Sequence, residues 1–222
     1  MGIDDRGFLV RPAPFECLAG DLLPGVLRDV RNGLPLAVLS IGGADGIEAM
    51  TAGITLLSVF GSWAGPPPIV ALRGDGDGED WNPSSIYPAS AVRGLAGPVK
   101  RRFFRCGYGE FSGAVKVRDE VRWLIRFESW TDFLASQGED LFDIALCHAG
   151  LVSHRLDRVI ERLRPGGHLV MEAIPRPFRG QALVPVGENH FRREEAPSRA
   201  VVVGGVSRHG SGLHLRGGPG DR

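Results

Sequence analysis

The sequence contains little cysteine and no excess of either charge. Its three cysteines, Cys17, Cys106 and Cys147, lie far apart and match neither a metal-binding spacing nor a disulfide framework. We therefore predict no metal site and expect the thiols to be reduced and mostly buried. Acidic and basic residues balance at 26 each, which argues against a surface for nucleic acid or for an anionic membrane.

Long apolar runs are also absent. No stretch approaches the length that spans a membrane, and the N-terminus lacks the basic, apolar and small-residue pattern of a secretory signal. The sequence therefore predicts a soluble cytoplasmic protein without membrane insertion. Its 222 residues fit one substantial domain and are too few for two large ones.

Residues 36–57 carry the clearest structural pattern. The apolar run LAVLSI is typical of a buried strand, the glycines of GGADG at residues 42–46 interrupt it, and apolar residues then recur at helical spacing. At the carboxyl end of a parallel strand, such a turn lets a ligand approach the backbone and directs the amides of the next helix toward it. Turns of this kind also occur where nothing binds, so the pattern alone leaves both possibilities open.

The rest of the chain alternates between expected strands and helices. This alternation produces βαβ units, so we predict an α/β fold with a mostly parallel sheet, helices on both faces and an antiparallel C-terminal portion. Residues 87–122 show only short extended pieces. We expect strands at residues 69–72, 124–127, 141–148 and 168–172, and helices at residues 130–136 and 151–164.

The predicted organisation has three parts. Residues 1–32 form a helical segment that packs on the core, and residues 33–205 form the α/β domain. Residues 206–222, rich in glycine and arginine, form a disordered tail.

Two motifs in the second half of the chain point to a family. FDIALCH begins at Phe142 and LRPGGHLVME begins at Leu163, both behind a glycine turn with a nearby acid. This combination resembles the class I S-adenosylmethionine-dependent methyltransferases and implies their Rossmann-like fold. The order of the pieces from Phe8 to Phe191, including YPASAVRGLAGPVKRRFF and VRWLIRF, resembles the catalytic domain of the CheR-type chemotaxis receptor glutamate methyltransferases. We expect the helical domain that precedes this domain in many members to be missing.

The resemblance implies S-adenosylmethionine as the cofactor and assigns family roles to matching positions. Arg11 takes the place of the arginine beside the cofactor and the substrate carboxylate, where a guanidinium can hold a glutamate side chain with two hydrogen bonds. Gly42, Gly46 and Glu48 match the family's glycine turn. The cofactor-binding residues that we predict are Gly42, Gly43, Gly46, Glu48, Asp75, Thr131, Asp132 and His148.

Several positions depart from the family pattern. Arg73 falls where the family has the acid that holds the cofactor ribose, and a guanidinium has no hydrogen-bond acceptor, so Asp75 or Asp77 is the candidate replacement. Thr131 replaces the asparagine near the adenine, with Asp132 beside it. An asparagine and a tyrosine that follow the fourth strand in the family are replaced by Ala149 and Ser153.

The chemistry depends on the methyl acceptor. A carboxylate is already ionised near neutral pH, so methyl transfer to it requires positioning more than proton transfer. A hydroxyl or amine acceptor would need a base, for which His148 and His154 are the candidates. The catalytic residues that we predict are Arg11, His148 and His154.

Three functions remain open from the sequence. The first is an S-adenosylmethionine-dependent methyltransferase that acts on a protein or on a small molecule. The second is a methyltransferase-like domain without catalysis that serves as a binding or regulatory module. The third is a nucleotide-binding α/β domain, although the sequence lacks a P-loop lysine and a dinucleotide fingerprint.

Overall fold

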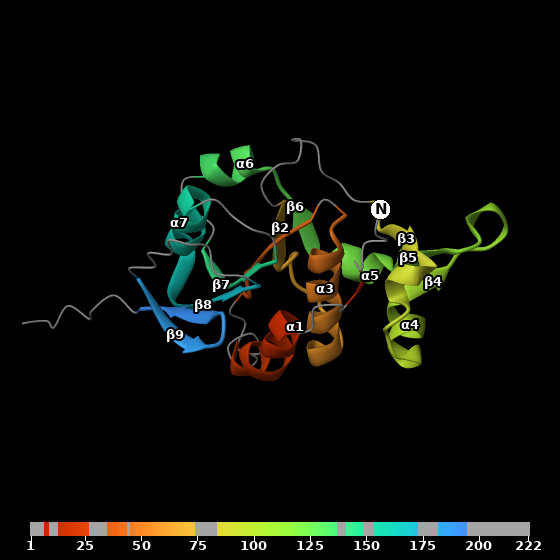
Figure 1. Ribbon diagram of the computed structural model, residues 1–222, viewed down its shortest axis with the longest axis horizontal. Coiled ribbons are helices and arrows are strands. Elements are labelled where there is room, and N and C mark those ends of the chain that lie inside the picture. The colour runs from red at the N-terminus through yellow and green to blue at the C-terminus, as the bar shows by residue number, and fades with distance from the viewer. Residues whose placement is uncertain are drawn as a thin grey trace, which may run out of the picture.

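A seven-stranded sheet with helices on both faces forms the centre of the computed structural model, which describes residues 7–8, 13–26, 35–43, 45–73, 84–136, 141–148, 153–172 and 182–194 (Figure 1). In spatial order its strands are β6 (Ile125–Phe127), β2 (Ile69–Arg73), β1 (Val38–Gly42), β7 (Phe142–Cys147), β8 (Leu163–Met171), β10 (His190–Arg193) and β9 (Leu183–Gly187). The strands from β6 to β8 are parallel, whereas β10 runs antiparallel to both β8 and β9. The predicted α/β fold, with its antiparallel C-terminal portion, is confirmed.

Helices cover the two faces of this sheet with separate hydrophobic clusters. α3 (Ile47–Phe60) packs on one face together with the N-terminal helices α1 (Ala13–Cys17) and η1 (Leu18–Leu22). α6 (Trp130–Ala135) and α7 (Ser153–Glu161) pack on the other face. The sheet is therefore covered on both sides, as parallel sheets generally are.

β1 is buried along its whole length because it lies between these two layers. Val38 joins the cluster around α3, whereas Leu39 and Ile41 join the cluster around α6 and α7. A strand buried on both faces has a continuous apolar sequence rather than an alternating one. This explains why the run LAVLSI predicted a strand correctly.

A second, three-stranded sheet lies between β2 and β6 in the sequence (Figure 1). We call residues 84–124 the small-sheet unit, and its elements are β3 (Ile86–Pro88), η2 (Ala89–Val92), α4 (Gly97–Phe103), β4 (Phe104–Cys106), η3 (Gly109–Phe111), β5 (Ala114–Val117) and α5 (Asp119–Arg122). The strands run antiparallel in the order β3, β5, β4. Strands of three or four residues are too short to show an alternating pattern, so the sequence indicated only extended pieces here.

The small-sheet unit is attached to α3 in the middle and at the C-terminal end of the helix. Val121 packs against Gly53, where an added Cβ would lie 3.0 Å from the Val121 side chain. Arg102 donates hydrogen bonds to the carbonyls of Leu57 and Gly61, at 3.2 and 2.6 Å. A cation at this position also interacts favourably with the helix dipole.

Three expectations from the sequence are corrected by the structure. The helix expected to reach residue 164 ends at Glu161, and β8 begins at Leu163 rather than at residue 168. Glycine permits this irregular start of the strand, because a Cβ at Gly167 would come within 2.9 Å of a backbone oxygen. Cys106 is exposed, so the expectation that the thiols are mostly buried is wrong for that residue.

The three-part organisation stays a prediction, because residues 206–222 and much of the segment 1–32 lie outside the described residues. Residues 13–26 are helical and bury apolar side chains in the hydrophobic cluster on the α3 side of the sheet. Within the described part of the chain, no helix is both long enough and apolar enough to cross a membrane.

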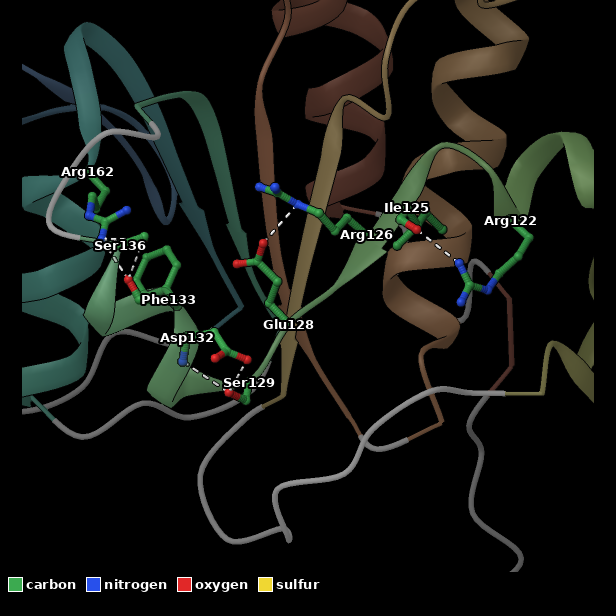
Figure 2. A network of polar contacts seen from close by, with 9 residues as sticks. All are labelled: Arg122, Ile125, Arg126, Glu128, Ser129, Asp132, Phe133, Ser136 and Arg162. Atoms are coloured by element: carbon green, nitrogen blue, oxygen red, sulfur yellow. Dashed lines mark hydrogen bonds and ion pairs between the residues drawn. The ribbon is translucent and has the colours of Figure 1, made fainter.

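A buried arginine joins the two helices on the second face. Arg162 is 7% exposed, and its guanidinium lies 4.7 Å from the ring centroid of Phe133 in α6. One guanidinium nitrogen donates to the Phe133 carbonyl at 2.6 Å and to the Ser136 hydroxyl at 2.9 Å (Figure 2). The last carbonyls of a helix have no partner within the helix. Arg162, which follows α7, therefore supplies a partner to the end of α6 and holds the two helices together.

Arg162→Met should lower the free energy of unfolding by about 2 kcal/mol, because a buried carbonyl loses a charge-assisted hydrogen bond. Arg158→Met is the matched control, since Arg158 makes an exposed pair with Glu161 at 2.8 Å. Such a pair contributes about 0.5 kcal/mol or less. Chemical denaturation measures both changes, and an equal loss in the two variants would show that Arg162 is not an anchor.

Three polar side chains connect the N-terminal helices to the sheet. Cys17 Sγ lies 3.6 Å from His190 Nδ1, and His190 Nε2 lies 3.0 Å from His168 Nδ1. Burial and the charge of Asp21 raise the pKa of the Cys17 thiol, so the thiol stays protonated and donates to His190. His190 Nε2–H then donates to His168, and this assignment leaves both rings neutral.

Stability should therefore fall on mild acidification. Burial lowers the pKa of His168 and of His190 below 6.5, and the charges of His190 and Arg192 lower that of His168 further. Near that pH the unfolded chain binds protons that the folded chain does not, so this contribution is complete above pH 6.5 and is lost as the pH falls below it. Between about pH 7.5 and about pH 5.5, the melting temperature of His190→Gln should drop less than that of the unmodified protein. An equal drop would assign the pH dependence to other groups.

Candidate functional site

The order of the strands defines where a ligand is expected to bind. In doubly wound sheets, ligands bind outside the carboxyl ends of the strands, at the point where the strand order reverses. Here this point lies between β1 and β7. The glycine turn follows β1, and His148 follows β7 with its amide donating to the Ile41 carbonyl at 2.8 Å. The structure thus brings the predicted glycine turn and His148 together at the switch point.

The glycine turn is shaped by a close approach between its first residue and Glu48. Glu48 Oε2 accepts a hydrogen bond from the Gly43 amide at 3.2 Å. A Cβ added at Gly42 would lie 2.7 Å from the same oxygen and 2.9 Å from the Glu48 Cβ. Gly46 has a φ of 70°, a conformation that favours glycine. The turn therefore requires glycine at positions 42 and 46, and it carries a carboxylate.

Two acids lie at the N-terminal end of α3. Asp45 Oδ1 accepts from the Ile47 amide at 3.2 Å, and Glu48 is in the first turn of the helix. Acids at this position are favoured by the helix dipole without any ligand. Glu48 is set apart from Asp45 by its position, because its carboxylate folds back over the end of β1.

Tyr87 contacts the glycine turn from the small-sheet unit. Its hydroxyl donates to the Asp45 carbonyl at 2.8 Å, and the residue is 6% exposed. Burial, followed by the charges of Asp45 and Glu48, raises the pKa of Tyr87, so it remains a hydrogen-bond donor. Sequence reasoning missed this residue, because it lies 42 positions from its partner in a stretch without a clear pattern.

An aromatic side chain from the N-terminal helices covers His148. The ring of Phe15 in α1 stacks on the imidazole with a centroid distance of 4.7 Å and an angle of 14°. His154, the other predicted base, is exposed in the first turn of α7. Arg11 and Asp75, like Ala149, lie outside the described residues. The roles of Arg11 and Asp75 therefore stay predictions.

The residues predicted near the adenine lie at the start of α6, after β6. Ser129 caps this helix: its hydroxyl accepts from the Asp132 amide at 3.1 Å and donates to the Asp132 carboxylate at 2.8 Å (Figure 2). Thr131 and Asp132 are both exposed. β6 is two strands away from β1, or about 10 Å at the usual strand spacing. A nucleoside could span that distance along the carboxyl edge of the sheet.

Glu128 is an acid at this edge that sequence reasoning missed. It follows β6, its side chain is 18% exposed, and it forms an ion pair with Arg126 at 2.8 Å (Figure 2). Its amide donates to the Ala71 carbonyl in β2, which fixes its position beside the end of that strand. An acid directly after a short predicted strand was the available signal.

A cavity of about 580 Å³ lies away from these residues, in the small-sheet unit. It is lined by β3, β4, β5 and the turn that contains η3, and by none of the predicted site residues. Tyr108 and Phe111, both exposed, form part of its wall. The cavity is therefore distinct from the switch point.

A sequence profile of the family described as "CheR methyltransferase, SAM binding domain" matches residues 5–171. The chain belongs to this CheR family. The family inferred from the motifs is thus confirmed, and so is S-adenosylmethionine as the cofactor of the domain. The roles of individual residues stay predictions.

The CheR-family chain also resembles individual proteins. It is 29% identical over 150 residues to chemotaxis protein methyltransferase 2 of Pseudomonas aeruginosa, in an alignment that covers 63% of the chain and 53% of that protein. The chain thus spans about half the length of this relative. It is 13% identical to the structure of precorrin-6y C5,15-methyltransferase from Geobacter metallireducens GS-15, with a TM-score of 0.31 over 69% of the chain and 61% of that protein. Similarity at that level supports no further conclusion.

Gly42→Ala should weaken the binding of S-adenosylhomocysteine about tenfold or more, because the new methyl group displaces the Glu48 carboxylate from the turn. Gly94→Ala is the matched control, since nothing lies within 4 Å of a Cβ at that position. Calorimetric titration measures the affinity. Equal affinity in both variants would show that the close approach of Gly42 and Glu48 does not shape the cofactor site.

Proposed function

We propose that the chain is an S-adenosylmethionine-dependent methyltransferase of the protein-glutamate type. The observation that carries this proposal is the position of the glycine turn and Glu48 at the switch point of a CheR-family domain. The methyl acceptor is a carboxylate on a partner protein. A cytoplasmic location and the absence of a nucleic-acid partner belong to the same proposal.

The residues around the turn fit the cofactor. Gly42 and Gly46 leave the backbone open to a ligand, and Glu48 offers a carboxylate to the ammonium group of the methionine part. At the other end of the edge, Glu128 and Asp132 offer oxygen acceptors for the ribose and the adenine. Arg73 cannot accept a hydrogen bond from the ribose. In this proposal Glu128 and Asp132 take that role, in addition to the Asp75 predicted from the sequence.

The chemistry requires little proton transfer. When bound, S-adenosylmethionine supplies a methyl group on a positively charged sulfur. A glutamate acceptor is ionised near neutral pH, so the protein has to align it rather than deprotonate it. Arg11 holds this carboxylate, and His148, which stacks on Phe15, forms part of the wall of the site rather than a base.

A methyltransferase-like domain that binds a partner without catalysis is the second candidate. One observation favours it: the Asp132 carboxylate already accepts a hydrogen bond from Ser129 in a helix cap. An acid engaged in this way is less available to a nucleoside. Cofactor binding distinguishes the two functions.

Calorimetric titration with S-adenosylmethionine and with S-adenosylhomocysteine tests the proposal. We expect micromolar binding of both ligands, and about tenfold weaker binding in Glu48→Ala, because a charge-assisted hydrogen bond to the ammonium is lost. Glu120→Ala, an exposed acid in α5, is the control. A folded protein that binds neither ligand at millimolar concentration would overturn the proposal and favour the non-catalytic domain.

A further inference from the structure

We propose that Tyr87 is a positioning residue that fixes the cofactor-binding turn from the small-sheet unit, an inference that rests on the proposed function. Its hydroxyl donates to the carbonyl of Asp45, the residue directly before Gly46. Nothing in the motifs of the turn requires a tyrosine so far away in the sequence. The assignment comes from the geometry.

The turn needs such a support because glycines surround Asp45. Gly42, Gly43 and Gly46 have access to more backbone conformations than other residues, so the ligand-free turn has more freedom to lose on binding. Glu48 restrains one side by accepting from the Gly43 amide. Tyr87 restrains the other side through the Asp45 carbonyl. Together the two contacts hold one backbone amide of the turn, that of Gly43, and one backbone carbonyl, that of Asp45.

The ring of Tyr87 is itself held in place. Phe8 packs edge-on against it with a centroid distance of 5.1 Å, and Phe8 in turn packs edge-on against Phe104 at 4.8 Å. In the sheet, Tyr87 pairs with Val115 of β5. A hydroxyl on a ring packed in this way has a fixed position, which is the requirement for preorganising a binding site.

The small-sheet unit that carries Tyr87 is also fixed relative to α3. Val121 packs on Gly53 in the middle of the helix, and Arg102 binds the carbonyls at its C-terminal end. Tyr87 adds a third contact just before the N-terminal end of the helix, at Asp45. The position of the Tyr87 hydroxyl is therefore fixed relative to α3, the helix whose first turn forms part of the proposed cofactor site.

Tyr87→Phe removes the hydroxyl and keeps the packed ring, and Tyr108→Phe is the matched control. Tyr108 is the only other tyrosine of the sequence, lies in the same unit and is 88% exposed. In Tyr87→Phe we expect the dissociation constant of S-adenosylhomocysteine and the KM for S-adenosylmethionine to rise about three- to tenfold, as for the loss of one hydrogen bond. kcat should change little, and amide hydrogen exchange in residues 43–50 should be faster without ligand. Tyr108→Phe should match the unmodified protein in all four measurements.

The outcomes separate this inference from the proposed function. If the unmodified protein binds the cofactor and Tyr87→Phe binds it equally well, with unchanged exchange in the turn, Tyr87 does not position the turn and the proposed function stands. A Tyr87→Phe protein that does not fold would also overturn the inference, because it would assign the hydroxyl to the stability of the core. An unmodified protein without cofactor binding would overturn the proposed function and this inference with it.

Discussion

The site depends on the absence of a side chain at the end of β1. Gly42 lets Glu48 fold back until its carboxylate reaches the Gly43 amide, a distance that a Cβ at position 42 would prevent. The strand end and the first turn of α3 are thereby held at a short distance. Because β1 is the buried strand at the switch point, this local contact places a negative charge where a doubly wound sheet binds its ligand. The helix dipole lowers the cost of that charge.

The contacts of the turn differ in range along the sequence. Glu48 acts on a residue five positions away, whereas Tyr87 acts on one 42 positions away. A local contact forms with the turn itself. A distant contact forms only when the small-sheet unit has folded and packed on α3. The conformation of the turn therefore reports on the packing of the unit as well as on its own sequence.

The central elements could be predicted from the sequence because their signals are local and long. The run LAVLSI and the apolar spacing after it predicted β1 and α3, and the glycines marked the turn between them. The small-sheet unit was not predicted, because its strands are too short to show a period. The cap of α6 had a local signal, serine three residues before aspartate, whereas the resemblance to the family assigned Asp132 to the adenine. Nothing in the sequence around Tyr87 indicated its contact with the glycine turn.

The small-sheet unit is inserted in the chain between β2 and β6, and this position explains how Tyr87 reaches the glycine turn. β2 is parallel to β1 and its register pairs Gly42 with Arg73, so the chain leaves β2 at the edge where the glycine turn lies. An insertion at this point starts beside the site. Its first strand, β3, can therefore contact the turn, while its last helix, α5, contacts the middle of α3 before the chain enters β6. If the unit were attached at the amino ends of the strands, it would lie near the C-terminal end of α3 and away from the turn. Support of the turn by the small-sheet unit therefore follows from the parallel order of β1 and β2.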